Sequence, residues 1–175
     1  NIFAYLINDS RAETIAIEPE FQQQLVDVAD DLLHLKRVIL IIGENESRDQ
    51  VWEQISSRYE VYQYLDLLDE TVFEGKPPGY RDLMGVFYTS GTTGPSKGVT
   101  MTHAHAFEYA RGVTEMLELR ESDVYCSALP LFHIAGLLAT VYAAGIVGAS
   151  TAIVGPFSVE RFWQDVEEYH VTTTF

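Results

Sequence analysis

Residues 88–99 read YTSGTTGPSKGV, a segment made of glycine, proline and hydroxyl side chains in which Lys97 is the only charged residue. Small residues between two regular elements leave backbone N–H groups in a concave array, and such an array can cradle phosphate oxygens. Lys97 adds a positive charge beside those amides. The segment therefore predicts an anion-binding loop, although an ordinary surface turn would also account for one or two of its glycines and its proline.

The segments on either side predict how this loop is held. Apolar residues from Met84 to Tyr88 predict a strand that leads into the loop. On the other side, Thr102 is placed to cap a helix that runs to about Leu119. We therefore expect a strand, the loop and a helix, in that order.

Two common phosphate-binding motifs do not fit the loop. A Walker A motif ends in glycine, lysine and a hydroxyl residue, whereas here Ser96 precedes Lys97 and Gly98 follows it. The glycine spacing of a dinucleotide-binding GxGxxG motif is also absent.

The N-terminal part of the chain alternates β-prone and helical patterns. TIAI (14–17) and KRVILIIG (36–43) predict strands, and the near-continuous apolar run of the second is typical of a parallel strand covered on both faces. Between them, FQQQLVDVADDLLHL (21–35) has apolar residues at helical spacing. Residues 44–58 suggest a connecting helix, and 61–70 fit either a strand or a helix.

The C-terminal part repeats this alternation. DVYCSALPLFHIAG (123–136) predicts a short strand and a proline-containing turn, and FSVERFWQDVEEYHV (157–171) predicts an amphipathic helix before a last β-prone run. Residues 134–155 carry no charge, but glycines interrupt them, so a buried helix and a buried strand are expected rather than a membrane span. The predicted fold class is α/β, a mostly parallel sheet flanked by helices.

Composition restricts the possible partners. The chain has 175 residues and a formal net charge of -15, which argues against nucleic acid as a general partner. Cys126 is its only cysteine, so no intrachain disulfide can form, and the cytoplasm is the expected location. The first residues lack the pattern of a signal peptide and an initiator methionine, so we expect the chain to begin at a cut point.

TSGTTGPSKG closely resembles the phosphate-binding loop of the adenylate-forming superfamily, which includes acyl-CoA synthetases, luciferases and the adenylation domains of peptide synthetases. One departure is that the family usually has proline directly before the lysine, whereas here Pro95 and Ser96 stand in the opposite order. The resemblance implies that the loop contacts the β and γ phosphates of ATP through Thr89, Ser90, Gly91, Thr92, Thr93, Gly94 and Lys97. Thr92 is in addition a candidate magnesium ligand.

A second segment, ALPLFHIAGL (128–137), is similar to the family's next core motif. Amino-acid-activating members usually carry Phe-Asp where this chain has Phe132 and His133, so the resemblance is to the acyl-CoA synthetases, carnitine-CoA ligase-like members included. In these enzymes the histidine borders the carboxylate and thioester region. Without the resemblance, His133 would be interpreted as a core histidine whose hydrogen bonds the backbone satisfies.

The resemblance implies an AMP-forming acid-thiol ligase that uses ATP, Mg²⁺ and coenzyme A. Lys97 and His133 are its candidate catalytic residues here, and the helix after His133 is a candidate tunnel wall through Leu137, Leu138, Val141 and Tyr142. The family's later glutamate, aspartate, hinge and C-terminal lysine motifs do not occur, so we expect residues 1–175 to be a single incomplete segment of the N-terminal domain, inactive alone. An adenylation domain that loads a carrier protein and a non-catalytic nucleotide-binding module remain alternatives.

Other polar residues indicate no site. His103 and His105 are two residues apart, so on a helix they point to different faces and are expected to begin that helix rather than bind a metal. Cys126 lies in an apolar context and is expected to be inert.

Overall fold

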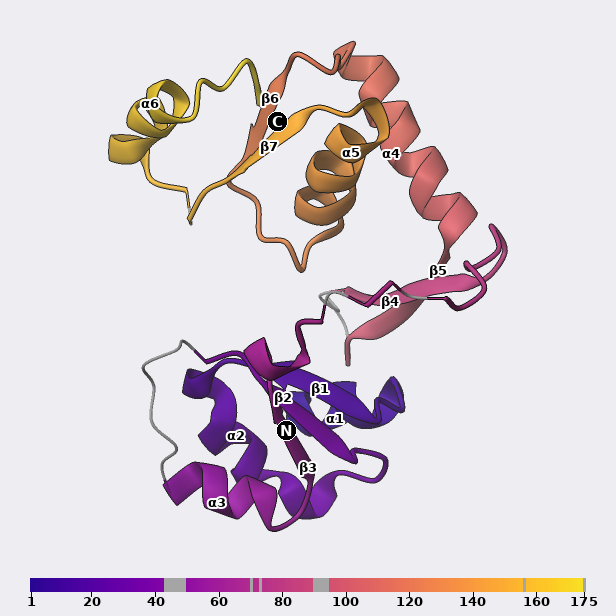
Figure 1. Ribbon diagram of the computed structural model, residues 1–175, viewed down its shortest axis with the longest axis vertical. Helices are drawn as coiled ribbons and strands as arrows, with labels where there is room; N and C mark the ends of the chain where they lie inside the picture. The colour runs from indigo at the N-terminus through magenta and orange to yellow at the C-terminus, as the bar shows by residue number, and fades with distance from the viewer. Residues whose placement is uncertain (43–49, 70, 73, 90–94, 156, 175) are drawn as a thin grey trace. The chain divides into compact units, whose positions relative to one another are not determined.

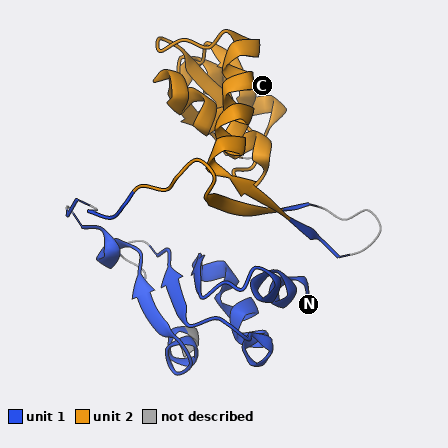
Figure 2. Cartoon of the chain, turned by 90° about the vertical axis from the view of Figure 1, so that its right-hand side faces the viewer, with its two compact units in different colours: residues 1–76, 88–98 blue, residues 77–87, 99–175 orange. Residues whose placement is uncertain are grey.

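A computed structural model describes residues 1–42, 50–69, 71–72, 74–89, 95–155 and 157–174. Helices alternate with strands along the chain, and the strands form two parallel three-stranded sheets and one two-stranded sheet (Figure 1). The chain divides into two compact units, residues 1–76 with 88–98 and residues 77–87 with 99–175 (Figure 2). The predicted α/β class is confirmed, and the single-domain assignment stays a prediction.

The first unit is built on a parallel sheet in the order β1-β2-β3. Its strands are β1 (Thr14–Ile17), β2 (Arg37–Leu40) and β3 (Glu60–Gln63). β2 is central because it pairs with both β1 and β3. Val38 and Leu40, on one face of the strand, are fully buried, and Ile39 on the other face is half-buried. The ambiguous segment 61–70 contains both candidates, a strand followed by the short 3₁₀ helix η3 (Leu65–Leu67).

The helices of the first unit are shorter than the sequence predicts. In place of one helix over 21–35, the chain forms η1 (Pro19–Phe21), α2 (Gln22–Asp27) and η2 (Ala29–Asp31). The side chain of Asn8 donates to the carbonyl oxygen of Asp31 at 2.8 Å and accepts from the amide of Leu33 at 2.9 Å. These two bonds hold the backbone in a turn, so a tertiary contact overrides the helical pattern.

Two further helices belong to this unit. α3 (Gln50–Ser56) lies within the segment where a connecting helix was expected. α1 (Ile2–Asp9) was not predicted; Asn1 caps it by accepting from the amide of Phe3, and Ala4 and Ile7 are buried.

The two-stranded sheet pairs β4 (Leu83–Thr89) with β5 (Lys97–Thr102). The connection is too short for a parallel crossover, so the two strands form an antiparallel hairpin. The predicted order of strand, loop and helix is therefore wrong: β5 stands between the loop and the helix that follows. The described ends of the loop, Thr89 and Lys97, therefore belong to two paired strands.

The second unit contains a parallel sheet in the order β7-β6-β8, with β6 (Val124–Ser127) at its centre. β7 (Ser150–Ile153) and β8 (Thr173–Thr174) flank it, and the amphipathic helix α6 (Val159–Glu168) precedes β8 as expected. Tyr125 on the central strand is fully buried in the main apolar cluster of this unit.

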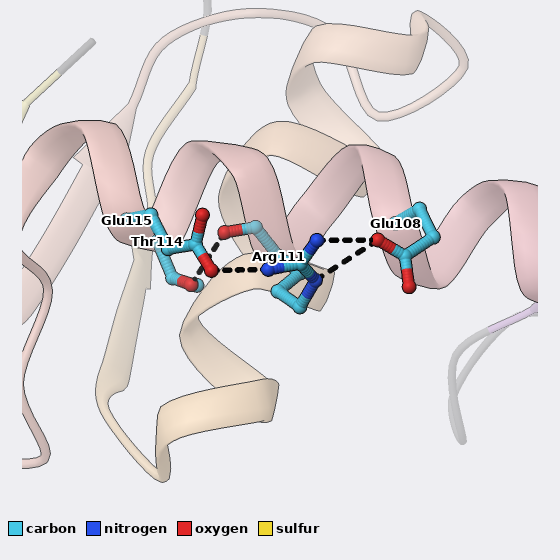
Figure 3. A network of polar contacts seen from close by, with 4 residues as sticks. All are labelled: Glu108, Arg111, Thr114 and Glu115. Carbon is cyan, nitrogen blue, oxygen red and sulfur yellow. Dashed lines mark hydrogen bonds and ion pairs between the residues drawn. The ribbon is translucent and has the colours of Figure 1, made fainter.

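The longest helix, α4 (His103–Leu117), begins where the sequence predicts, because the hydroxyl of Thr102 accepts from the amide of His105 at 3.2 Å. It packs on the helical segment that follows β6. On its exposed side, Arg111 forms ion pairs with Glu108 and Glu115, one turn away in each direction (Figure 3). Such pairs support a helix modestly.

The charge-free segment folds into a π-helical stretch, η4 (Ala135–Tyr142), continued by α5 (Ala143–Val147). Gly148 ends α5 in the left-handed conformation, with φ of 77°, and β7 follows, as the glycine pattern predicted. Within the described part of the chain, no helix has both the length and the apolar character needed to cross a bilayer.

Candidate functional site

The two ends of the glycine- and hydroxyl-rich loop are described, and they bring Thr89 and Lys97 together. Thr89 ends β4 and Lys97 begins β5. The hydroxyl of Thr89 donates to the carbonyl oxygen of Lys97 at 3.4 Å, a long and weak bond. The predicted phosphate contacts Ser90, Gly91, Thr92, Thr93 and Gly94 lie outside the described residues.

Both end residues are available for a ligand. Thr89 and Lys97 are exposed, and no described residue forms an ion pair with Lys97. In a chain with a net charge of -15, a lysine with no carboxylate partner among the described residues is a local source of positive potential. The arrangement can therefore attract an anion at the foot of the loop.

Helix α1 contacts the chain near both described ends of the loop. The hydroxyl of Tyr88, next to Thr89, donates to Oδ2 of Asp9 at 2.7 Å. The hydroxyl of Tyr5 donates to the carbonyl oxygen of Ser96, next to Lys97, at 2.8 Å. One helix is thus hydrogen bonded to the chain on either side of the loop.

Tyr88 keeps its proton under ordinary conditions. Two main effects raise the pKa of Tyr88 from 10.0 to about 12. The larger is burial of the hydroxyl, and the next is its hydrogen bond to the carboxylate of Asp9. The tyrosine therefore remains a hydrogen-bond donor to Asp9 at neutral pH.

His133 belongs to the second unit and stands just before η4. Its Nδ1 accepts a hydrogen bond from the amide of Ala135 at 3.1 Å, and its own amide donates to the carbonyl oxygen of Pro130 at 2.9 Å. The neutral imidazole accordingly carries its proton on Nε2. His133 is exposed in this chain, and the backbone satisfies one of its ring nitrogens.

The proposed tunnel wall divides into core and surface. Leu138 is fully buried in a cluster with Met101 and Ala106, so its side chain is used in packing. Tyr142 also lines an open depression beside Tyr80 and Phe107. Leu137 and Val141 are half-buried.

Across the described ranges, no three His, Cys, Asp or Glu side chains gather as they would around a metal ion. His103 and His105 begin α4, as expected. Cys126 is buried, and burial raises the pKa of its thiol, which agrees with the expectation that it is inert.

A family profile described as "AMP-binding enzyme" matches residues 3–175. The chain therefore belongs to the AMP-binding enzyme family, and the predicted resemblance is confirmed. It is 30% identical over 174 residues to a crotonobetaine/carnitine-CoA ligase of Citrobacter koseri. The matched region covers 98% of this chain and 32% of the relative. It is also 31% identical to the peroxisomal long chain acyl-CoA synthetase 6 of Arabidopsis thaliana, over 82% of this chain and 21% of the relative.

Solved structures share the fold. An anthranilate CoA ligase in complex with anthranoyl-AMP superposes with a TM-score of 0.75 at 22% identity, over 98% of this chain and 32% of that one. ATP-bound MatB from Rhodopseudomonas palustris superposes with a TM-score of 0.67 at 19% identity, over 95% of this chain and 30% of that one. The chain thus spans about a third or less of the length of these proteins.

Proposed function

We propose that the full-length protein containing this chain is an AMP-forming acid-thiol ligase. In the first step a carboxylate oxygen attacks the α-phosphorus of ATP, which forms an acyl-adenylate and releases pyrophosphate. In the second step the thiol sulfur of coenzyme A attacks the acyl carbon, loses its proton and displaces AMP. The observation that carries the proposal is the family match over residues 3–175, which includes the whole loop.

The task proposed for the loop is electrostatic and positional. Lys97 and the loop amides would hold the β and γ phosphates and spread the charge that develops on the departing pyrophosphate. The exposure of Thr89 and Lys97 at the foot of the loop supports this assignment. Ser90, Gly91, Thr92, Thr93 and Gly94 are assigned the same role from the sequence.

Magnesium is expected to accompany ATP. A threonine hydroxyl is a hard oxygen donor of the type that Mg²⁺ accepts, so Thr92 would fit this ion, together with phosphate oxygens and water. Bound there, the ion would neutralise phosphate charge.

His133 is proposed to border the acyl end of the site.

Names of relatives support an acid and coenzyme A as substrates, because both curated proteins described above are named as CoA ligases or synthetases. The net charge of -15 supports a small-molecule substrate over nucleic acid. A cytoplasmic location is proposed on the same grounds as before, the single cysteine.

ATP-pyrophosphate exchange on the full-length protein tests the proposal, with a panel of carboxylic acids that includes short, long, aromatic and quaternary-ammonium-bearing members. Acid-dependent exchange is the expected result. Its absence with every acid would favour the non-catalytic module. If exchange occurs, thioester formation with free coenzyme A, rather than with a carrier protein, then separates a CoA ligase from a carrier-loading domain.

A further inference from the structure

We propose that Tyr5 and Asp9 of helix α1 are positioning residues that fix the two ends of the loop at residues 89–97. This inference rests on the proposed function, because the ligand of the loop is taken to be the phosphate chain of ATP. Tyr5 and Asp9 lie outside the sequence motif of the loop.

The geometry places both residues on one surface. Tyr5 and Asp9 are four residues apart in α1, so they lie one turn apart on the same face of the helix. Asp9 accepts from the hydroxyl of Tyr88, the residue before Thr89, and Tyr5 donates to the carbonyl oxygen of Ser96, the residue before Lys97, at 2.7 and 2.8 Å. These contacts, which we call the α1 clamp, join segments separated by 79 and 91 residues.

Helix α1 has the anchoring that such a role requires. Its side chains Ala4 and Ile7 are buried, and Ile7 belongs to the apolar cluster around β2. The side chain of Asn8, on the same helix, makes two hydrogen bonds to the backbone of the turn after η2. The clamp therefore connects the two ends of the loop to the core of the first unit.

The chemistry of the two bonds suits a permanent clamp. A tyrosine hydroxyl bonded to a carboxylate is a charge-assisted hydrogen bond, roughly twice as strong as a neutral one. The raised pKa of Tyr88 keeps the donor protonated. The Tyr5 bond goes to a backbone oxygen and so does not depend on the side chain at position 96.

The consequence for ATP follows from where the bonds fall. Each clamped residue is the immediate neighbour of a predicted phosphate contact: Tyr88 of Thr89, and Ser96 of Lys97. Fixing both ends before ATP arrives lowers the ordering cost that binding must meet. The clamp should therefore act on the affinity for ATP and pyrophosphate and leave the affinity for the acid unchanged.

The experiment compares Tyr88→Phe, Tyr5→Phe and Tyr59→Phe in the full-length protein. Each removes one tyrosine hydroxyl from the first unit. Tyr59 is the matched control because its hydroxyl donates to the carbonyl oxygen of Ala29 at 3.2 Å, a contact outside the clamp. In ATP-pyrophosphate exchange we expect the KM for ATP and for pyrophosphate to rise about three- to tenfold in the clamp variants only, with the KM for the acid unchanged.

Asp9→Asn is a further variant, which keeps an acceptor for Tyr88 but removes its charge. Its amide oxygen still accepts from Tyr88 but carries no charge, so its KM for ATP should lie between wild type and Tyr88→Phe. If both clamp variants show the same KM values as Tyr59→Phe, the positioning role is wrong.

Hydrogen exchange without nucleotide separates this inference from the proposed function. We expect faster amide exchange over residues 88–89 and 96–98 in the clamp variants than in wild type or Tyr59→Phe. Unchanged exchange there would overturn the clamp even in an active enzyme. Faster amide exchange in a protein that shows no ATP-pyrophosphate exchange would confirm the contacts and contradict the proposed function.

Discussion

A Cβ atom built on Gly136 would lie 2.3 Å from the carbonyl oxygen of Pro130. It would also lie 2.7 Å from the carbonyl oxygen of Leu129, so two backbone groups of the turn approach η4 at a point where only glycine fits. The segment that carries His133 thus folds back onto the first turn of η4.

Gly136→Ala is expected to destabilise the protein by about 3 kcal/mol, because backbone atoms must shift to admit the methyl group. Chemical denaturation measures this as a lower free energy of unfolding. Gly112→Ala is the matched control: nothing lies within 4 Å of its Cβ position in α4, and a helical glycine replaced by alanine gains about 0.5–1 kcal/mol. Equal stability of the two variants would contradict the close approach at Gly136.

The Tyr88 contact predicts a dependence of stability on high pH. Its pKa is raised from 10.0 to about 12 in the folded chain, so the folded state holds this proton more tightly than the unfolded state. The stabilisation is fully present below about pH 10 and is lost as the pH rises to about 12.

Tyrosinate absorbance measures this pKa by comparing wild type with Tyr88→Phe. The variant should lack the titration step near pH 12 and keep the others. A missing step near pH 10 would show that Tyr88 is not bonded to Asp9 in solution.

His133 is predicted to have two separable roles. His133→Ala removes the acceptor for the amide of Ala135 and should cost about 1 kcal/mol of stability. His133→Asn should recover most of this, since an asparagine side chain can accept from the amide two residues on. Both variants should still raise the KM for the acid or slow thioester formation. Full activity of His133→Asn would reduce the histidine to a structural residue.

Cys126 should resist thiol reagents in the native protein. It is buried on the central strand β6, and burial raises the pKa of its thiol. We expect negligible reaction with Ellman's reagent at pH 8 under native conditions and one thiol per chain in denaturant. Rapid reaction in the native state would show that β6 is exposed.

The sequence predicts the parallel sheets because their strands are short apolar or β-branched runs. The apolar run at residues 38–40 illustrates this: it lies in the central strand β2, in which Val38 and Leu40 are fully buried. It does not predict β5, where Met101 is the only buried residue and the capping signal of α4 begins at the last strand residue.

Elements that depend on tertiary contacts are equally hidden. The end of the helix expected at 21–35 depends on Asn8, a residue on another helix. The π-helical form of η4 has no signature in AGLLATVY, because a mostly apolar stretch shows no period that separates one helix type from another.

For the candidate site, the sequence predicts the pairing of Thr89 and Lys97 at one place, because both flank one short loop. It cannot predict that Tyr5 and Asp9 reach the same place. Their partners are separated by 91 and 79 residues, and neither residue belongs to a recognisable motif.

The most direct test of the central claim is kcat/KM for ATP in ATP-pyrophosphate exchange. It is measured for Lys97→Ala alone and for Lys97→Ala combined with Thr92→Val. Lys76→Ala is the matched control, an exposed lysine elsewhere in the first unit. We predict at least a tenfold loss of kcat/KM for ATP in Lys97→Ala, a further loss with Thr92→Val, and unchanged values for Lys76→Ala. Wild-type exchange kinetics in both loop variants would contradict the assignment of residues 89–97 to the phosphates of ATP.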